Sequence, residues 1–179
     1  MKKLLAAAAA VLALALQSCA LTPSGQGVAT GQPLAMEEFM VASDPGIQVY
    51  VRNKYPRSAG RFASENVVLF VHGATYPSET SFDLPLDGLS WMDFIAQRGY
   101  DVYLLNIRGY SRSTKPPEMN EPPETNAPIV RSDMAVRDVA AVVEFIRKRR
   151  GVDKVNLIGW SWGASIMGKY TTVNNDKVG

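Results

Sequence analysis

The sequence Gly159-Trp160-Ser161-Trp162-Gly163 stands between a predicted β-strand at residues 154–158 and a predicted α-helix at residues 164–170. In a G-x-S-x-G pentad with this setting, the serine lies on a tight, strained turn at the carboxyl end of the strand. Side chains two positions before and two positions after the serine would collide with the strand and the helix, so both positions favour glycine. The pattern therefore predicts an exposed Ser161 with Gly159 and Gly163 packed closely on either side.

Strands and helices alternate over the residues that precede the pentad. An unbroken apolar run at residues 67–71 is typical of a strand buried on both faces. A run of basic residues followed by Gly151 indicates the C-terminal end of a long helix that Ser132 is expected to cap. Together the patterns predict strands at 38–41, 47–51, 67–71 and 101–107 and helices at 89–98 and 132–150. This order indicates the α/β class, with a mostly parallel sheet flanked by helices.

Two further motifs follow predicted strands, where parallel sheets place their chemistry. His72-Gly73-Ala74 follows the strand at 67–71, and Arg108-Gly109-Tyr110-Ser111-Arg112-Ser113 follows the strand at 101–107. The order of these two motifs and the pentad along the chain resembles that of the serine-nucleophile branch of the α/β-hydrolase family. The resemblance covers residues 37–179, which is about the first half of the family's domain, truncated after the nucleophile helix.

The resemblance implies a serine hydrolase that forms an acyl-enzyme on a small-molecule ester, thioester or amide, without a cofactor. Ser161 would be the nucleophile, and the backbone N–H groups of Ala74 and Trp162 would form the oxyanion hole. A serine at this position argues against the epoxide-hydrolase and dehalogenase branches. The alternatives are transfer of the acyl group to an alcohol, a structural serine in a tight turn, and a non-catalytic envelope lipoprotein that keeps the scaffold.

The family's general base is a histidine after the last strand, oriented by an acid after strand six or seven. The single histidine of this chain, His72, belongs by resemblance to the oxyanion turn, and no residue is nominated as the acid. We therefore expect residues 36–179 to be the N-terminal part of a longer hydrolase, inactive and poorly soluble alone, with the strand at 154–158 as an open sheet edge. Two positions depart from the family pattern, with Asn106 in place of aspartate and Ser111 in place of glycine.

The first residues have the pattern of an export signal. Lys2 and Lys3 precede an apolar run at residues 4–16, which is too short to span a bilayer. The following Leu16-Gln17-Ser18-Cys19 resembles the lipobox of bacterial lipoproteins, which implies acylation of Cys19 and anchoring in the cell envelope. An ordinary signal cut after Ala20, giving a periplasmic or secreted protein, is the alternative. We thus expect a signal peptide at 1–18 and a flexible tether at 19–35.

Composition excludes several other classes of protein. The chain has 19 basic and 17 acidic residues, and removal of Lys2 and Lys3 leaves it neutral, which argues against nucleic-acid binding. One cysteine and one histidine exclude an internal disulfide and make a zinc site improbable, so no metal is expected.

Overall fold

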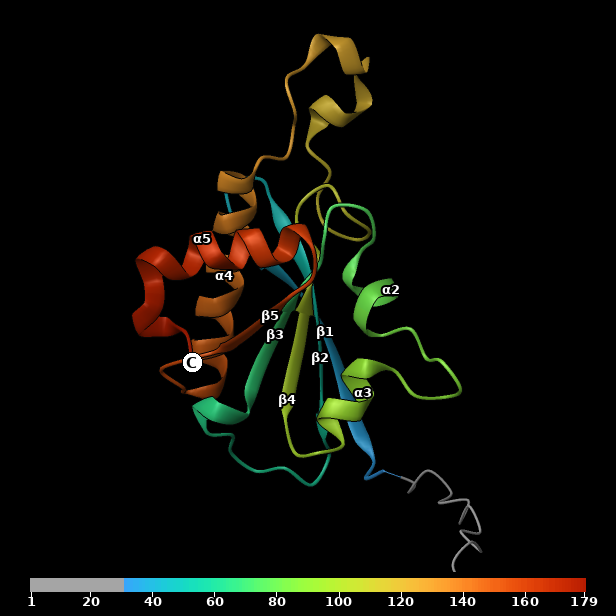
Figure 1. Ribbon diagram of the computed structural model, residues 1–179, viewed down its shortest axis with the longest axis vertical. Helices are drawn as coiled ribbons and strands as arrows, with labels where there is room; N and C mark the ends of the chain where they lie inside the picture. Colours follow the sequence, from blue (N-terminus) through green and yellow to red (C-terminus); the bar gives the residue numbers. More distant parts are fainter. Residues whose placement is uncertain (1–30) are drawn as a thin grey trace, which may run out of the picture. The chain divides into compact units, whose positions relative to one another are not determined.

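The computed structural model describes residues 31–179, which contain a five-stranded sheet of order β1-β2-β4-β3-β5 (Figure 1). The predicted α/β class is confirmed. The strands are β1 (Leu34–Ala42), β2 (Gln48–Pro56), β3 (Val67–Val71), β4 (Asp101–Leu105) and β5 (Asn156–Gly159). The α-helices are α2 (Ser78–Phe82), α3 (Trp91–Ala96), α4 (Ser132–Arg150) and α5 (Trp162–Asn174). Short 3₁₀ turns are η1 (Ser64–Asn66), η2 (Pro117–Asn120), η3 (Pro123–Thr125) and η4 (Asn175–Lys177).

The sheet is mixed, and β2 alone runs against the others. β1 and β2 form an antiparallel hairpin, and β2 pairs antiparallel with β4. β3 pairs parallel with β4 on one side and with β5 on the other. In this register Val71 lies opposite both Leu105 and Gly159, so the carboxyl ends of the three parallel strands β3, β4 and β5 meet at one end of the sheet.

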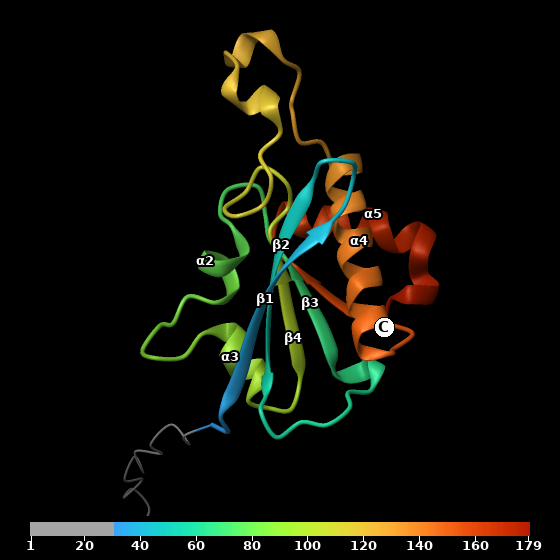
Figure 2. The same ribbon diagram turned by 180° about the vertical axis from the view of Figure 1, so that it is seen from behind.

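Helices cover both faces of the sheet (Figures 1 and 2). Alternate side chains of β3 enter different cores: Leu69 packs with α4 and α5, while Phe70 packs with α2 and α3. Phe70 stacks on Phe82 of α2 with ring centroids 4.4 Å apart. The uninterrupted apolar sequence of β3 therefore follows from burial on both sides.

The helices differ from the prediction in several places: α5 extends over Trp162–Asn174 instead of 164–170, and α2 was not predicted. Ser132 is the first helical residue of α4 and does not cap it; the N-cap is Arg131, which makes no side-chain capping bond. The helix predicted at 89–98 is shorter, because Ser90 and Asp93 form a capping box that starts α3 at Trp91. The predicted end of α4 is confirmed, since Gly151 adopts the left-handed conformation with φ 66°.

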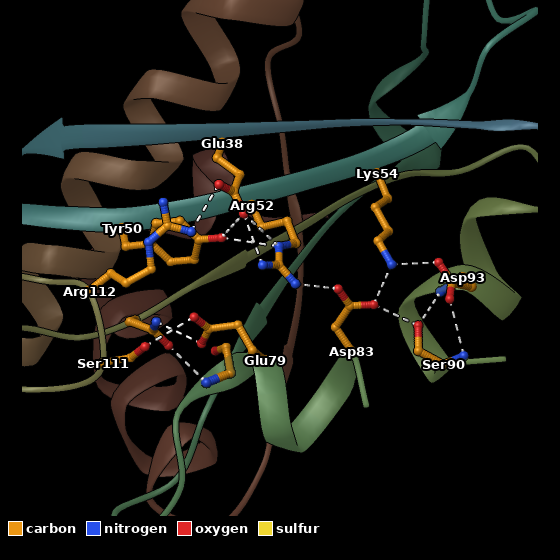
Figure 3. Close-up of polar contacts among 12 residues, drawn as sticks. Glu38, Tyr50, Arg52, Lys54, Glu79, Asp83, Ser90, Asp93, Ser111 and Arg112 are labelled. Atoms are coloured by element: carbon orange, nitrogen blue, oxygen red, sulfur yellow. Dashed lines mark hydrogen bonds and ion pairs between the residues drawn. The ribbon is translucent and has the colours of Figure 1, made fainter. Parts of the chain in front are cut away.

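A chain of ion pairs ties the hairpin to the segment that carries α2 and α3 (Figure 3). Asp83 accepts from Arg52 at 2.8 Å and from Lys54 at 2.6 Å. Glu38 accepts a 2.5 Å bond from the Tyr50 hydroxyl, and this bond, together with Arg112 and Arg52, lowers the Glu38 pKa to about 2. These charges pair among themselves, which indicates a structural role.

Within residues 31–179, β5 is an edge strand of the sheet, as expected. Val178 forms one parallel bridge to Val155, just before β5 begins. Across the same residues, no helix is long and apolar enough to cross a membrane. The predicted signal peptide, most of the predicted tether and Cys19 lie outside the described residues.

Candidate active site

Ser161 lies in the turn between β5 and α5 with a backbone conformation that L-residues rarely adopt. Its φ is 53° and its ψ is −121°, and its side chain is exposed. The turn is held by two backbone bonds: Trp160 N–H donates to Val71 O at 3.1 Å, and Gly163 N–H donates to Trp160 O at 2.9 Å. The strain is thus held by β3 and by the first turn of α5.

Both glycines of the pentad lie where a side chain does not fit. A β-carbon at Gly163 would lie 2.7 Å from the His72 carbonyl oxygen, and closer still to that of Val71. A β-carbon at Gly159 would lie 2.6 Å from Cε of Met167 and 2.7 Å from the carbonyl carbon of Gly163. The collisions expected from the sequence are present in the structure.

The turn after β3 and the turn after β5 form one small pocket. Ser161 and Ala74 both line this space of about 100 Å³, and Trp160, which is 64% exposed, flanks it. Glycine at position 73 lets the turn after β3 lie close to Ser161, because a β-carbon at position 73 would lie only 2.9 Å from Cβ of Ser161. The remaining lining residues are Thr75, Tyr76 and Ser81.

Two backbone N–H groups near Ser161 have no hydrogen-bond acceptor among the described residues. Within residues 31–179, Ala74 N–H donates to no backbone or side-chain acceptor. Trp162 is the first residue of α5, so its N–H has no intrahelical acceptor and lies at the positive end of the helix dipole. The Trp162 side chain instead packs against the apolar core and does not line the pocket.

His72 braces the turn that contains Ala74. The ring is buried, and Ile107 N–H donates to Nε2 at 3.0 Å. Nδ1 lies 2.6 Å from Gly73 O, so Nδ1 carries the proton and donates it. Burial lowers the His72 pKa, against a smaller opposing effect of the Gly73 bond. With both nitrogens engaged and the ring neutral, His72 is not placed to accept a proton from Ser161.

Tyr110 is a site residue that the sequence pattern did not indicate. Its hydroxyl donates a short hydrogen bond to Ala74 O, and its ring lies 4.5 Å from the His72 ring. The Gly73 carbonyl shares its peptide plane with the Ala74 N–H, so the His72 bond fixes the direction of that N–H. The Tyr110 bond holds the next peptide and so limits movement of the turn around Ala74. Tyr110 lies inside the motif after β4, but that pattern does not show which residue its hydroxyl reaches.

The two departures from the family pattern meet at Glu79. Asn106 accepts from Ser78 N–H at 2.8 Å and donates to Glu79 at 2.8 Å. Ser111 has a φ of 44°, the left-handed backbone that favours glycine, at a cost of about 1 kcal/mol. Its hydroxyl donates to Glu79 at 3.1 Å, which offsets part of this cost.

Over residues 31–179, no group of three or more histidine, cysteine, aspartate or glutamate side chains is arranged to hold a metal ion.

Comparison with known proteins assigns the family. A sequence model described as the alpha/beta hydrolase fold matches residues 66–179, so this chain belongs to the alpha/beta hydrolase fold family. It is 28% identical over 133 residues to a probable lipase of Schizosaccharomyces pombe, covering 72% of this chain and 29% of that protein. It is 31% identical over 134 residues to lipase member M of Mus musculus, covering 73% and 31%. The chain thus spans about a third of the length of these relatives.

Solved structures show the same fold. An epoxide hydrolase from Vigna radiata superimposes with a TM-score of 0.58 at 22% identity, covering 80% of this chain and 37% of that one. This likeness supports the fold alone.

Proposed function

We propose that this chain carries the nucleophile and the oxyanion hole of a serine hydrolase. The observation that carries the proposal is the strained Ser161 at the start of α5, which shares a pocket with the free N–H of Ala74. The lipase relatives favour a carboxylic ester as the substrate, with thioesters and amides open to the same chemistry.

In the proposed reaction, Ser161 Oγ attacks the carbonyl carbon of the substrate and loses its proton to a general base. The carbonyl π electrons move to oxygen, and the oxyanion accepts hydrogen bonds from the N–H groups of Ala74 and Trp162. Collapse of this intermediate expels the alcohol, which takes up the proton, and leaves an acyl-enzyme. Water then attacks the acyl group, releases the acid and restores Ser161.

The base is proposed to lie outside the 179 residues, together with its acid. His72 is engaged at both ring nitrogens, and the chain spans only about a third of the relatives it matches. On this proposal the described residues form the N-terminal part of a complete hydrolase domain.

We also propose that the protein is exported and held in the cell envelope by acylation of Cys19. The support is the sequence before Cys19, whose final residues resemble a lipobox. Labelling of the source cell with palmitate tests this proposal. We expect the wild type to incorporate the label and Cys19→Ser to lose it. Incorporation that persists in Cys19→Ser, or no incorporation in the wild type, would contradict the proposal.

Labelling with a fluorophosphonate tests the nucleophile in the protein expressed from its complete gene. We expect labelling of the wild type and none of Ser161→Ala. Ser81→Ala is the matched control, because Ser81 lines the same pocket and its hydroxyl bonds only to Pro77 O among the described residues. A folded wild type that resists labelling, or labelling that survives Ser161→Ala, would overturn the proposal and favour a non-catalytic scaffold.

A further inference from the structure

The described chain enters its sheet at the end opposite Ser161. Leu34, the first residue of β1, pairs with Pro56, the last residue of β2. Lys54 of β2 in turn lies opposite Val102, near the start of β4. The entry point therefore lies at the same end of the sheet as the amino ends of β3, β4 and β5 (Figure 1). Ser161 follows the carboxyl end of β5, at the opposite end of the sheet.

The loops at this amino end carry an excess of unpaired positive charge. Five exposed cations have no ion pair within residues 31–179, and we call them the basic end: Arg57, Arg61, Arg98, Lys148 and Lys154. The loops 57–66 and 97–100 and the segment 147–154 contain only two carboxylates, Glu65 and Asp153. The amino end of the sheet is therefore electropositive.

Part of the basic end borders an open cleft of about 580 Å³. Arg149 and Arg150 line this cleft, but their charges are balanced by Glu37 and Asp101. Arg61 and Lys148 line it without such partners among the described residues, so the cleft has a net positive charge.

The helix dipole accounts for only part of this pattern. Cations in the last turn of α4, such as Lys148, interact favourably with the negative end of the helix. Arg98 follows the C-terminal end of α3 and donates to Phe94 O at 2.7 Å, so the same effect applies to it. Arg57 and Arg61 lie in the loop between β2 and η1, so no helix C-terminus accounts for their position.

The opposite end of the sheet has the opposite charge. Glu118, Glu121 and Glu124 follow the motif after β4 and form no ion pairs in the described part of the chain. They belong to the segment of η2 and η3, which projects beyond the carboxyl ends of the strands (Figure 1). A negatively charged surface would attract the basic end and repel this segment.

We propose that the basic end docks on anionic phospholipid headgroups and turns the Ser161 pocket away from the bilayer. The proposal rests on the envelope location proposed above. Cys19 and Gln32 are thirteen residues apart, which limits their separation to about 45 Å. An anchor on Cys19 would thus keep the basic end near the membrane, where each cation adds to the attraction within a Debye length of about 10 Å.

Vesicle co-sedimentation tests the docking without the anchor. The protein is the product of the complete gene beginning at Ala20, so that it carries neither the leader nor an acylated Cys19. The probes are vesicles of phosphatidylcholine alone and of phosphatidylcholine with about 40% phosphatidylglycerol. We expect binding only to the anionic vesicles, weakened at least about tenfold between about 50 and 300 mM NaCl.

Paired charge reversals locate the binding surface. Arg61→Glu with Lys148→Glu is expected to weaken binding at least about tenfold. The control, Lys115→Glu with Arg131→Glu, makes the same change in net charge at exposed positions outside the basic end and is expected to change binding less than about twofold. Both double variants should keep fluorophosphonate labelling of Ser161, so loss of docking is distinguishable from failure of the hydrolase proposal.

Three results would overturn the docking proposal. The first is that the protein does not bind anionic vesicles. The second is that it binds both kinds of vesicle equally and independently of salt. The third is that the two double variants lose binding to the same extent. A wild-type protein that docks as expected but resists the fluorophosphonate would overturn the hydrolase proposal alone.

Discussion

Gly163 touches Val71 through backbone alone: a β-carbon at residue 163 would overlap the Val71 carbonyl oxygen. The same carbonyl oxygen accepts a hydrogen bond from the N–H of Trp160 at 3.1 Å, so one carbonyl group of β3 holds the residues on both sides of Ser161. Because that contact is between main-chain atoms, no rearrangement of side chains can relieve an added methyl group.

Gly163→Ala is therefore expected to destabilise the protein by about 3 kcal/mol or more, or to prevent folding. The control is Gly168→Ala in the same helix, where a β-carbon would meet nothing within 4 Å. That variant is expected to gain about 0.5–1 kcal/mol from better helix propensity. Chemical denaturation of both variants measures the difference, and similar stabilities would contradict the packing described for Gly163.

Ser161→Gly should raise stability and remove reactivity together. Glycine adopts a φ of 53° without the clash that serine has, so the free energy of unfolding is expected to rise by about 1 kcal/mol. Fluorophosphonate labelling should disappear. A variant less stable than the wild type would show that the turn stores no strain at this residue.

Tyr110→Phe should impair catalysis more than substrate binding. It removes the hydroxyl that donates to Ala74 O while the ring keeps its position beside His72. Loss of an oxyanion donor costs about 100-fold or more, and a donor that is merely less well oriented should cost about tenfold in kcat. Ester hydrolysis by the complete protein should show this fall with KM nearly unchanged. A rise in KM at constant kcat would instead place Tyr110 in substrate binding.

The stability of the protein should fall as the pH drops below about 6.5. Burial lowers the His72 pKa in the folded state, so the unfolded chain takes up this proton at higher pH than the folded chain. The contribution of neutral His72 is complete above pH 6.5 and is lost as the pH falls towards the folded-state pKa. The slope is at most about 1.4 kcal/mol per pH unit.

His72→Gln removes the only titrating imidazole of the chain, so its unfolding free energy should lack this slope between pH 7.5 and 5.5. Denaturation at a series of pH values provides the comparison. An equal slope in the variant and the wild type would assign the pH dependence to other groups.

The sequence by itself determined the local elements and the strained turn at Ser161. The apolar run of β3, the basic C-terminal end of α4 and the spacing of Gly159, Ser161 and Gly163 each depend on residues close together in the chain. Short-range sterics and periodicity suffice to predict such features. The prediction that Ser132 caps α4 was wrong because it used residue type alone. A cap is defined by backbone conformation, and Ser132 already has the conformation of the helix.

Only the tertiary structure decided which distant groups meet. The bond from Tyr110 to Ala74 joins residues 36 positions apart, and the bond from Ile107 to His72 joins residues 35 apart. The meeting of Ser111 with Glu79 and the gathering of the basic end likewise depend on how the sheet is ordered. Strand order and register are set by packing of the whole domain, which no local pattern contains.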